Sequence, residues 1–233
     1  MTINNYSLVS LCFFALALLV KSVPAVDIEA LRIFNSLLFN EVFFSYYTEL
    51  GNGLVCLALI IPALSYISHK TSLNDVKVQT LVMVGLIIGV IVKALKELAS
   101  FSIRPGYYQF DDINYLEPIF SFNSFPSGHA ATIIGICFVW VSQAFKEVKI
   151  KHSALIISFV LFFALSVSLS RIVVAAHWLS DILGSIAIAF LIMNIIEIKN
   201  LKTVLYTSNA SKYLSFFLIG VAWFYIISQG TIY

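Results

Sequence analysis

Two polar segments lie between apolar runs of the chain, and together they hold two of its four histidines. The first is Pro126-Ser127-Gly128-His129, and the second combines Ser170-Arg171 with His177 and Asp181. Imidazole, guanidinium and carboxylate groups are costly at membrane depth, so their presence there usually marks a functional site. The alternative is structural: a proline-capped helix start with an incidental histidine, and a local His–Asp pair that stabilises a buried helix end.

The first segment has the composition of an anion-binding helix start. Pro126 suits a first helical turn, Ser127 supplies a hydroxyl, and Gly128 lets backbone approach a ligand. The unpaired amides at a helix N-terminus, with their partial positive charge, favour an anion. His129 would then place an imidazole beside that anion.

The second segment pairs an imidazole with a carboxylate. His177 precedes Asp181 by four residues, so on a helix the two would share a face, and the carboxylate could hold the imidazole in one tautomer. Arg171 and Arg104 could each bind phosphoryl oxygens through two parallel hydrogen bonds. For both arginines the alternative is an interfacial side chain that extends its charge toward water.

The composition requires a lipid environment. The chain has 233 residues, of which 60% are hydrophobic and 11% charged, against roughly 45–50% and 25% in soluble domains. A net charge of +2 and scattered lysines give no reason to expect nucleic acid. The three cysteines lie within apolar runs without framework spacing, so no disulfide is predicted.

Apolar runs of about 20 residues, enough to cross about 30 Å of hydrocarbon, predict an all-α polytopic membrane helical bundle. We expect one domain over residues 1–233, with a six-span core and a seventh, C-terminal span. The interleaved polar and apolar residues of 26–47 predict a helix lying in the membrane interface. The predicted spans are 7–20, 50–68, 76–95, 127–145, 153–169, 178–196 and 213–228.

The distribution of lysine and arginine predicts the orientation. Eight lysines fall in the connections after the second, fourth and sixth spans, whereas Lys21 and Arg32 fall on the opposite side when candidate site residues are left out. Basic residues concentrate in cytoplasmic loops. We therefore expect the N-terminus in the cytoplasm and both polar segments on the extracytoplasmic face. The eight are Lys70, Lys77, Lys146, Lys149, Lys151, Lys199, Lys202 and Lys212.

Residues 76–196 resemble the type 2 phosphatidic acid phosphatase family of membrane lipid phosphatases, which is related to vanadium haloperoxidases. The two polar segments are identical to its second and third signature motifs. The first motif departs from the family pattern of lysine, six residues and Arg-Pro, because seven residues separate Lys96 from Arg104-Pro105. A helix end before Ile103 could absorb the extra residue, since the position before proline disfavours helix. Lys93, one turn deeper, is the alternative.

The resemblance implies a phosphate pocket at the outer surface and a set of roles within it. His177 would attack phosphorus and form a phosphohistidine, Asp181 would orient His177, and His129 would act as acid and base. Fixed cations and amides would stabilise the charge of the transition state, so no metal or other cofactor is implied. The implied phosphate ligands are Lys96, Arg104, Ser127, Gly128 and Arg171.

We therefore predict an integral-membrane phosphatase of a bacterial inner membrane. Its partners would be the bilayer and a substrate such as phosphatidic acid, phosphatidylglycerol phosphate, lipid A phosphate or polyprenyl pyrophosphate, because the motifs recognise phosphate and not the tail. A phosphotransferase using the same histidine, a transporter and a haloperoxidase are the alternatives. The clustering of charges at one end of the spans disfavours a transporter, and the apolar composition disfavours a haloperoxidase.

Overall fold

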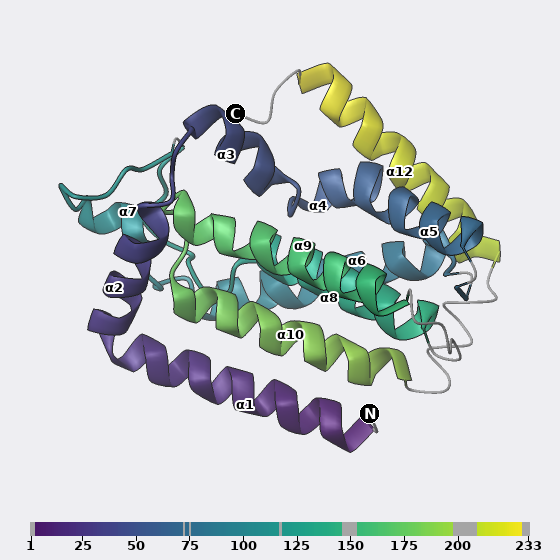
Figure 1. Cartoon of the computed structure of the whole chain (residues 1–233), viewed down its shortest axis with the longest axis horizontal. Coiled ribbons are helices and arrows are strands. Elements are labelled where there is room, and N and C mark those ends of the chain that lie inside the picture. The colour runs from purple at the N-terminus through teal and green to yellow at the C-terminus, as the bar shows by residue number, and fades with distance from the viewer. Residues whose placement is uncertain are drawn as a thin grey trace.

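The computed structural model describes residues 3–71, 73–74, 76–116, 118–145, 153–197 and 209–229, and every regular element within these ranges is a helix (Figure 1). Six helical segments in them are long and apolar enough to span a membrane. A further apolar helix, α8 (Gly128–Ala144), is shorter at 17 residues. The predicted helical membrane bundle is confirmed. The six segments are α1 (Ile3–Ser22), α4 to α5 (Gly53–Lys70), α6 (Val78–Leu98), α9 (Ser153–Val173), α10 (Leu179–Glu197) and α12 (Asn209–Gln229).

The second span is not one regular α-helix. It begins as α4 (Gly53–Val55), continues as the π-helix η1 (Cys56–Ile60) and ends as α5 (Ile61–Lys70). Pro62 lies in the first turn of α5 and has no amide proton to donate to the preceding turn. A wider turn is a common accommodation where the helical hydrogen-bond ladder is interrupted.

The segment predicted as one interfacial helix over 26–47 forms two helices, α2 (Pro24–Asn35) and α3 (Glu41–Glu49). The Asn40 side chain accepts a hydrogen bond from the Phe43 amide and so starts α3 as a separate helix. The inner face of α2 is bound to the bundle, since Asn35 donates to the carbonyl of Val173 and Asp27 accepts from Ser180. The prediction of a single helix was therefore wrong.

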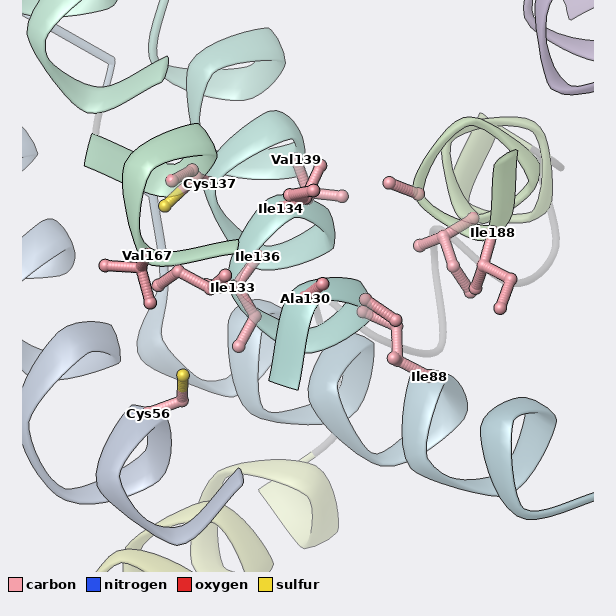
Figure 2. Packing of buried hydrophobic residues seen from close by; sticks show 14 of the residues in the cluster. Cys56, Ile88, Ala130, Ile133, Ile134, Ile136, Cys137, Val139, Val167 and Ile188 are labelled. Carbon is pink, nitrogen blue, oxygen red and sulfur yellow. The ribbon is translucent and has the colours of Figure 1, made fainter. Parts of the chain in front are cut away.

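Helix α8 lies in the interior of the bundle and contacts α6, α9 and α10. It is apolar on all sides, as expected of a helix surrounded by protein. Trp140 is fully buried and donates its indole proton to the carbonyl of Leu64 on α5. Figure 2 shows how buried side chains of neighbouring helices converge on α8. Fully buried residues of α8 include Ala130, Ala131, Ile133, Ile134, Cys137 and Val139.

Candidate active site

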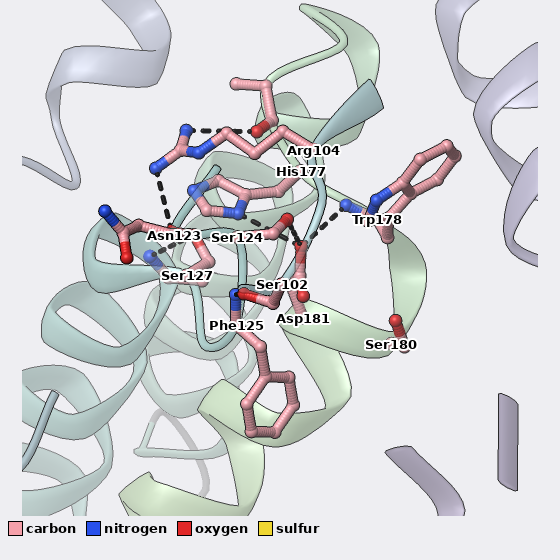
Figure 3. A network of polar contacts seen from close by, with 12 residues as sticks. Ser102, Arg104, Asn123, Ser124, Phe125, Ser127, His177, Trp178, Ser180 and Asp181 are labelled. Carbon is pink, nitrogen blue, oxygen red and sulfur yellow. Dashed lines mark hydrogen bonds and ion pairs between the residues drawn. The ribbon is translucent and has the colours of Figure 1, made fainter. Parts of the chain in front are cut away.

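Both polar segments meet at one end of the bundle. The start of α8, the end of α9 and the start of α10 gather there with the loop of residues 99–127 that carries α7 (Pro105–Tyr108). Backbone hydrogen bonds join these pieces: the Ser127 amide donates to Asp181, and the His177 amide donates to Arg171. Figure 3 shows the polar contacts around His177 and Asp181.

His177 and Asp181 form the predicted pair, with 3.2 Å between Nδ1 and Oδ2. His177 lies just before α10, so the two do not share a helical face as we had expected. Asp181 instead turns back over the helix start, where its Oδ2 also accepts from the Trp178 amide at 3.0 Å and from the Ser124 hydroxyl. Lys21 of α1 lies 3.5 Å from the other oxygen, Oδ1. The carboxylate is thus fixed from four sides.

The environment of His177 favours its neutral form. The residue is 2% exposed, and burial lowers the pKa of His177 well below its ordinary value, even though the hydrogen bond to Asp181 acts in the opposite direction. With Asp181 as acceptor, the single ring proton lies on Nδ1. Nε2 is then left with a free lone pair, as a nucleophile requires.

The start of α8 has the geometry of a capped helix. Ser127 is its N-cap residue, is fully buried, and accepts a weak hydrogen bond of 3.5 Å from the Ala130 amide through its hydroxyl oxygen. Ser185 of α10 donates to the Ser127 carbonyl at 2.8 Å. Because the hydroxyl oxygen acts as an acceptor, its hydrogen remains for an acceptor such as a phosphoryl oxygen. Gly128 follows as the first residue of the helix.

The two arginines differ in how fully their donors are used. Arg104 donates to the carbonyls of Phe122, Asn123 and Ala176 at 2.9 to 3.2 Å, so its guanidinium connects the loop to the residue before His177. Arg171 is 5% exposed and donates through NH1 to the Thr48 hydroxyl at 2.9 Å. Its buried Nε has no hydrogen-bond partner among the described residues.

Lys96 and Lys93 point to different surroundings. Helix α6 ends at Leu98, ahead of Ile103, as predicted. Lys96 donates to the Asn123 carbonyl at 3.0 Å, the same oxygen that accepts from Arg104. Lys93 is exposed and lines an apolar groove of about 450 Å³ beside Thr132. We therefore propose Lys96 as the lysine of the site.

A model of the PAP2 superfamily matches residues 76–201. The chain belongs to the PAP2 superfamily. Among solved structures it is similar to LpxE from Aquifex aeolicus, with 25% identity and a TM-score of 0.56 over 75% of this chain and 95% of that one. It also has the fold of a PAP2-type phosphatidylglycerolphosphate phosphatase from Bacillus subtilis, with 24% identity and a TM-score of 0.59 over 83% and 94% of the two chains. No curated protein sequence matches significantly.

PAP2 membership and the likeness to LpxE indicate an integral-membrane phosphatase that acts on phosphate esters. The structure also adds side chains to the site that sequence reasoning had missed. Thr48 contacts Arg171, and Glu49 contacts His129 from a distance of 80 residues along the chain. The sequence did hold a signal for Glu49, since this acidic residue directly precedes the predicted span 50–68. Acidic residues are rarely tolerated at membrane depth without a role.

Proposed function

We propose that this PAP2 protein hydrolyses a lipid phosphate or pyrophosphate through a phosphohistidine intermediate on His177. The buried His177–Asp181 pair carries the proposal, because its geometry leaves Nε2 unprotonated and fixes the ring. The neighbouring cations Arg171, Arg104 and Lys96, with the start of α8, supply positive charge and donors for phosphoryl oxygens. The B. subtilis enzyme with this fold is named for a phospholipid substrate, which supports a lipid as the phosphate carrier.

The reaction has two balanced steps. His177 Nε2 attacks phosphorus, the bond from phosphorus to the lipid oxygen breaks, and His129 gives a proton to that oxygen. Water then attacks phosphorus, the phosphorus–nitrogen bond breaks, and His129 accepts a proton from the water. Each step separates little charge because Asp181 balances the positive charge that develops on His177.

We expect the purified protein in detergent to release inorganic phosphate from at least one member of a lipid panel. The panel contains phosphatidic acid, phosphatidylglycerol phosphate, a lipid A phosphate and a polyprenyl pyrophosphate. Vanadate, which adopts the five-coordinate geometry of the transition state, should inhibit the release. Transfer of the phosphate to an added alcohol would indicate a phosphotransferase, and no release from any member would contradict the proposal.

We also propose that the site faces the extracytoplasmic side of a bacterial cytoplasmic membrane. The lysine distribution supports this orientation. Lys70 and Lys77 lie at the end of α5 and the start of α6, whereas Asp111 and Asp112 lie in the loop beside the site. The basic connections at 146–152 and 198–208 lie outside the described residues.

Cysteine accessibility tests this orientation. Because Lys70 and Asp111 are both exposed, an Asp111→Cys variant should react with a membrane-impermeant thiol reagent in intact cells. A Lys70→Cys variant should react after the cells are opened. The natural Cys12 is exposed on α1, so both variants are made in a Cys12→Ser background, which is also the control. The reverse labelling pattern would place the site in the cytoplasm.

A further inference from the structure

The last two residues of α3, Thr48 and Glu49, contact two of the proposed site residues, and a short turn of residues 50–52 follows them before α4. Glu49 Oε1 lies 2.9 Å from Nε2 of His129 and 3.9 Å from NH1 of Arg171. Glu49 is 6% exposed, and Asn52 donates to its other oxygen, Oε2, at 2.8 Å. The preceding residue, Thr48, accepts from Arg171. The end of α3 thus holds a buried carboxylate against the imidazole and next to the guanidinium.

The backbone of the turn is fitted to His129. At Gly51, a Cβ atom would lie 3.0 Å from both the Cβ and the carbonyl oxygen of His129, which is closer than side chains normally approach. Asn52 also starts α4, since its side-chain oxygen accepts from the Leu54 amide at 2.9 Å. Asn52, which donates a hydrogen bond to Glu49, is therefore itself fixed as the N-cap residue of α4.

Glu49 is ionised in this setting. Burial alone would raise the pKa of Glu49, but the hydrogen bonds from His129 and Asn52 and the charge of Arg171 outweigh it, so the pKa lies below its ordinary value. An ionised carboxylate only accepts hydrogen bonds, so Nε2 of His129 donates. The ring nitrogen left to hold or release the exchanged proton is Nδ1.

The charges around His129 explain why a carboxylate is required. The groups that act on the ring are Arg171 from α9, Lys96 from α6 and Glu49 from α3. Arg171 and Lys96 place two positive charges near the ring, yet a general acid must hold a proton before it can protonate the leaving oxygen. A neighbouring carboxylate offsets that charge and fixes the orientation of the ring.

We propose that Glu49 is a positioning residue for His129, and that it orients this histidine and favours its protonated form for transfer to the leaving lipid oxygen. The site then holds two carboxylate–imidazole pairs with different tasks. Asp181 leaves His177 neutral on its reactive nitrogen, whereas Glu49 orients the ring of His129 and favours its protonated form. This role rests on the proposed function, because it concerns the same phosphoryl transfer.

The test compares full-length wild-type protein with Glu49→Gln and Glu49→Asp in detergent, using short-chain phosphatidic acid as substrate across a pH series. We expect Glu49→Gln to lower kcat roughly tenfold or more, as part of the 10²–10⁴-fold contribution of a general acid, with little change in KM. Activity at alkaline pH is lost when His129 gives up its proton. Removal of the carboxylate makes that loss occur at lower pH, so the alkaline limb of kcat should move to lower pH.

Glu49→Asp keeps the charge and should restore the position of the alkaline limb while kcat stays below that of the wild type. Glu41→Gln is the matched control, because Glu41 lies on the same helix α3 and is exposed; it should leave both kcat and the limb unchanged. The role of Glu49 would be overturned, and the proposed function left intact, if folded Glu49→Gln protein lost activity at the same alkaline pH as wild type. A lower KM without loss of kcat would have the same meaning. If wild-type protein releases no phosphate from any lipid of the panel, both proposals fall.

Discussion

His177→Ala protein should release phosphate about 10⁴-fold more slowly than wild type, or slower still, because loss of a nucleophile leaves the catalysis that binding and charge stabilisation supply alone. Alanine cannot form the bond to phosphorus, and no other described imidazole is paired with Asp181. The first measurement is kcat in detergent. In the second, wild-type protein is mixed with lipid that carries a radiolabelled phosphate, the reaction is stopped rapidly without acid, and the label bound to the protein is counted. Label should remain on wild-type protein in alkali and be lost in acid, as expected of a phosphorus–nitrogen bond.

His69→Ala is the matched control, since His69 is exposed at the end of α5 far along the chain from the site, and its activity should equal that of wild type. The pH dependence gives a second check. The neutral form of His177 is the competent one, and burial lowers its pKa. The acid limb of kcat/KM should therefore lie below the pH of about 6.5 at which an ordinary histidine titrates. Label on His177→Ala protein would exclude His177 as the nucleophile.

The pairing of His177 with Asp181 was predictable from spacing, although the structural reason differs. Four residues suggested one helical face, but the structure uses the first turn of α10, where a carboxylate reaches back to the amide of Trp178. Both geometries bring residues i and i+4 together. The residue types at the site, and the family, could therefore be inferred before the local backbone was known.

Two contacts could not be inferred in the same way: that of Glu49 with His129, and those of Arg104 with backbone carbonyls. Glu49 reaches His129 across 80 residues, and no periodicity within α3 encodes such a contact. Arg104 was predicted as a phosphate ligand, and its site role remains a proposal. Its three hydrogen bonds to backbone carbonyls depend on how the loop brings Phe122, Asn123 and Ala176 around the guanidinium. Contacts of this kind arise from tertiary packing and not from local sequence.

The break between α2 and α3 has a similar origin. The apolar periodicity of residues 26–47 runs across it, so hydrophobic pattern alone predicts one helix. Two asparagines separate the helices. Asn35, at the end of α2, donates to the carbonyls of Val173 on α9 and Asn114 in the loop, and Asn40 caps the start of α3. Asparagine side chains compete with the helical backbone for hydrogen bonds. Their tertiary partners are not visible in the sequence.

Arg171 should show the second largest effect among the proposed site residues. It is buried, its Nε has no hydrogen-bond partner among the described residues, and its NH1 is held by Thr48. A phosphoryl oxygen would satisfy Nε and meet a cation whose position is already fixed. Removal of one preorganised donor to a developing negative charge typically lowers kcat about 10²–10³-fold, or about 2.7–4 kcal/mol.

We therefore expect Arg171→Ala to lose about 10²–10³-fold in kcat/KM for phosphate release. Arg171→Lys should recover only part of this, because an ammonium keeps the charge and loses the planar fork. Arg32→Ala is the control, since Arg32 is exposed and pairs with Glu29 and Asp112. Thermal unfolding of each variant separates lost catalysis from lost folding. Folded Arg171→Ala protein with activity within about threefold of wild type, less than the tenfold that 1.4 kcal/mol represents, would show that Nε does not bind the transferred phosphate.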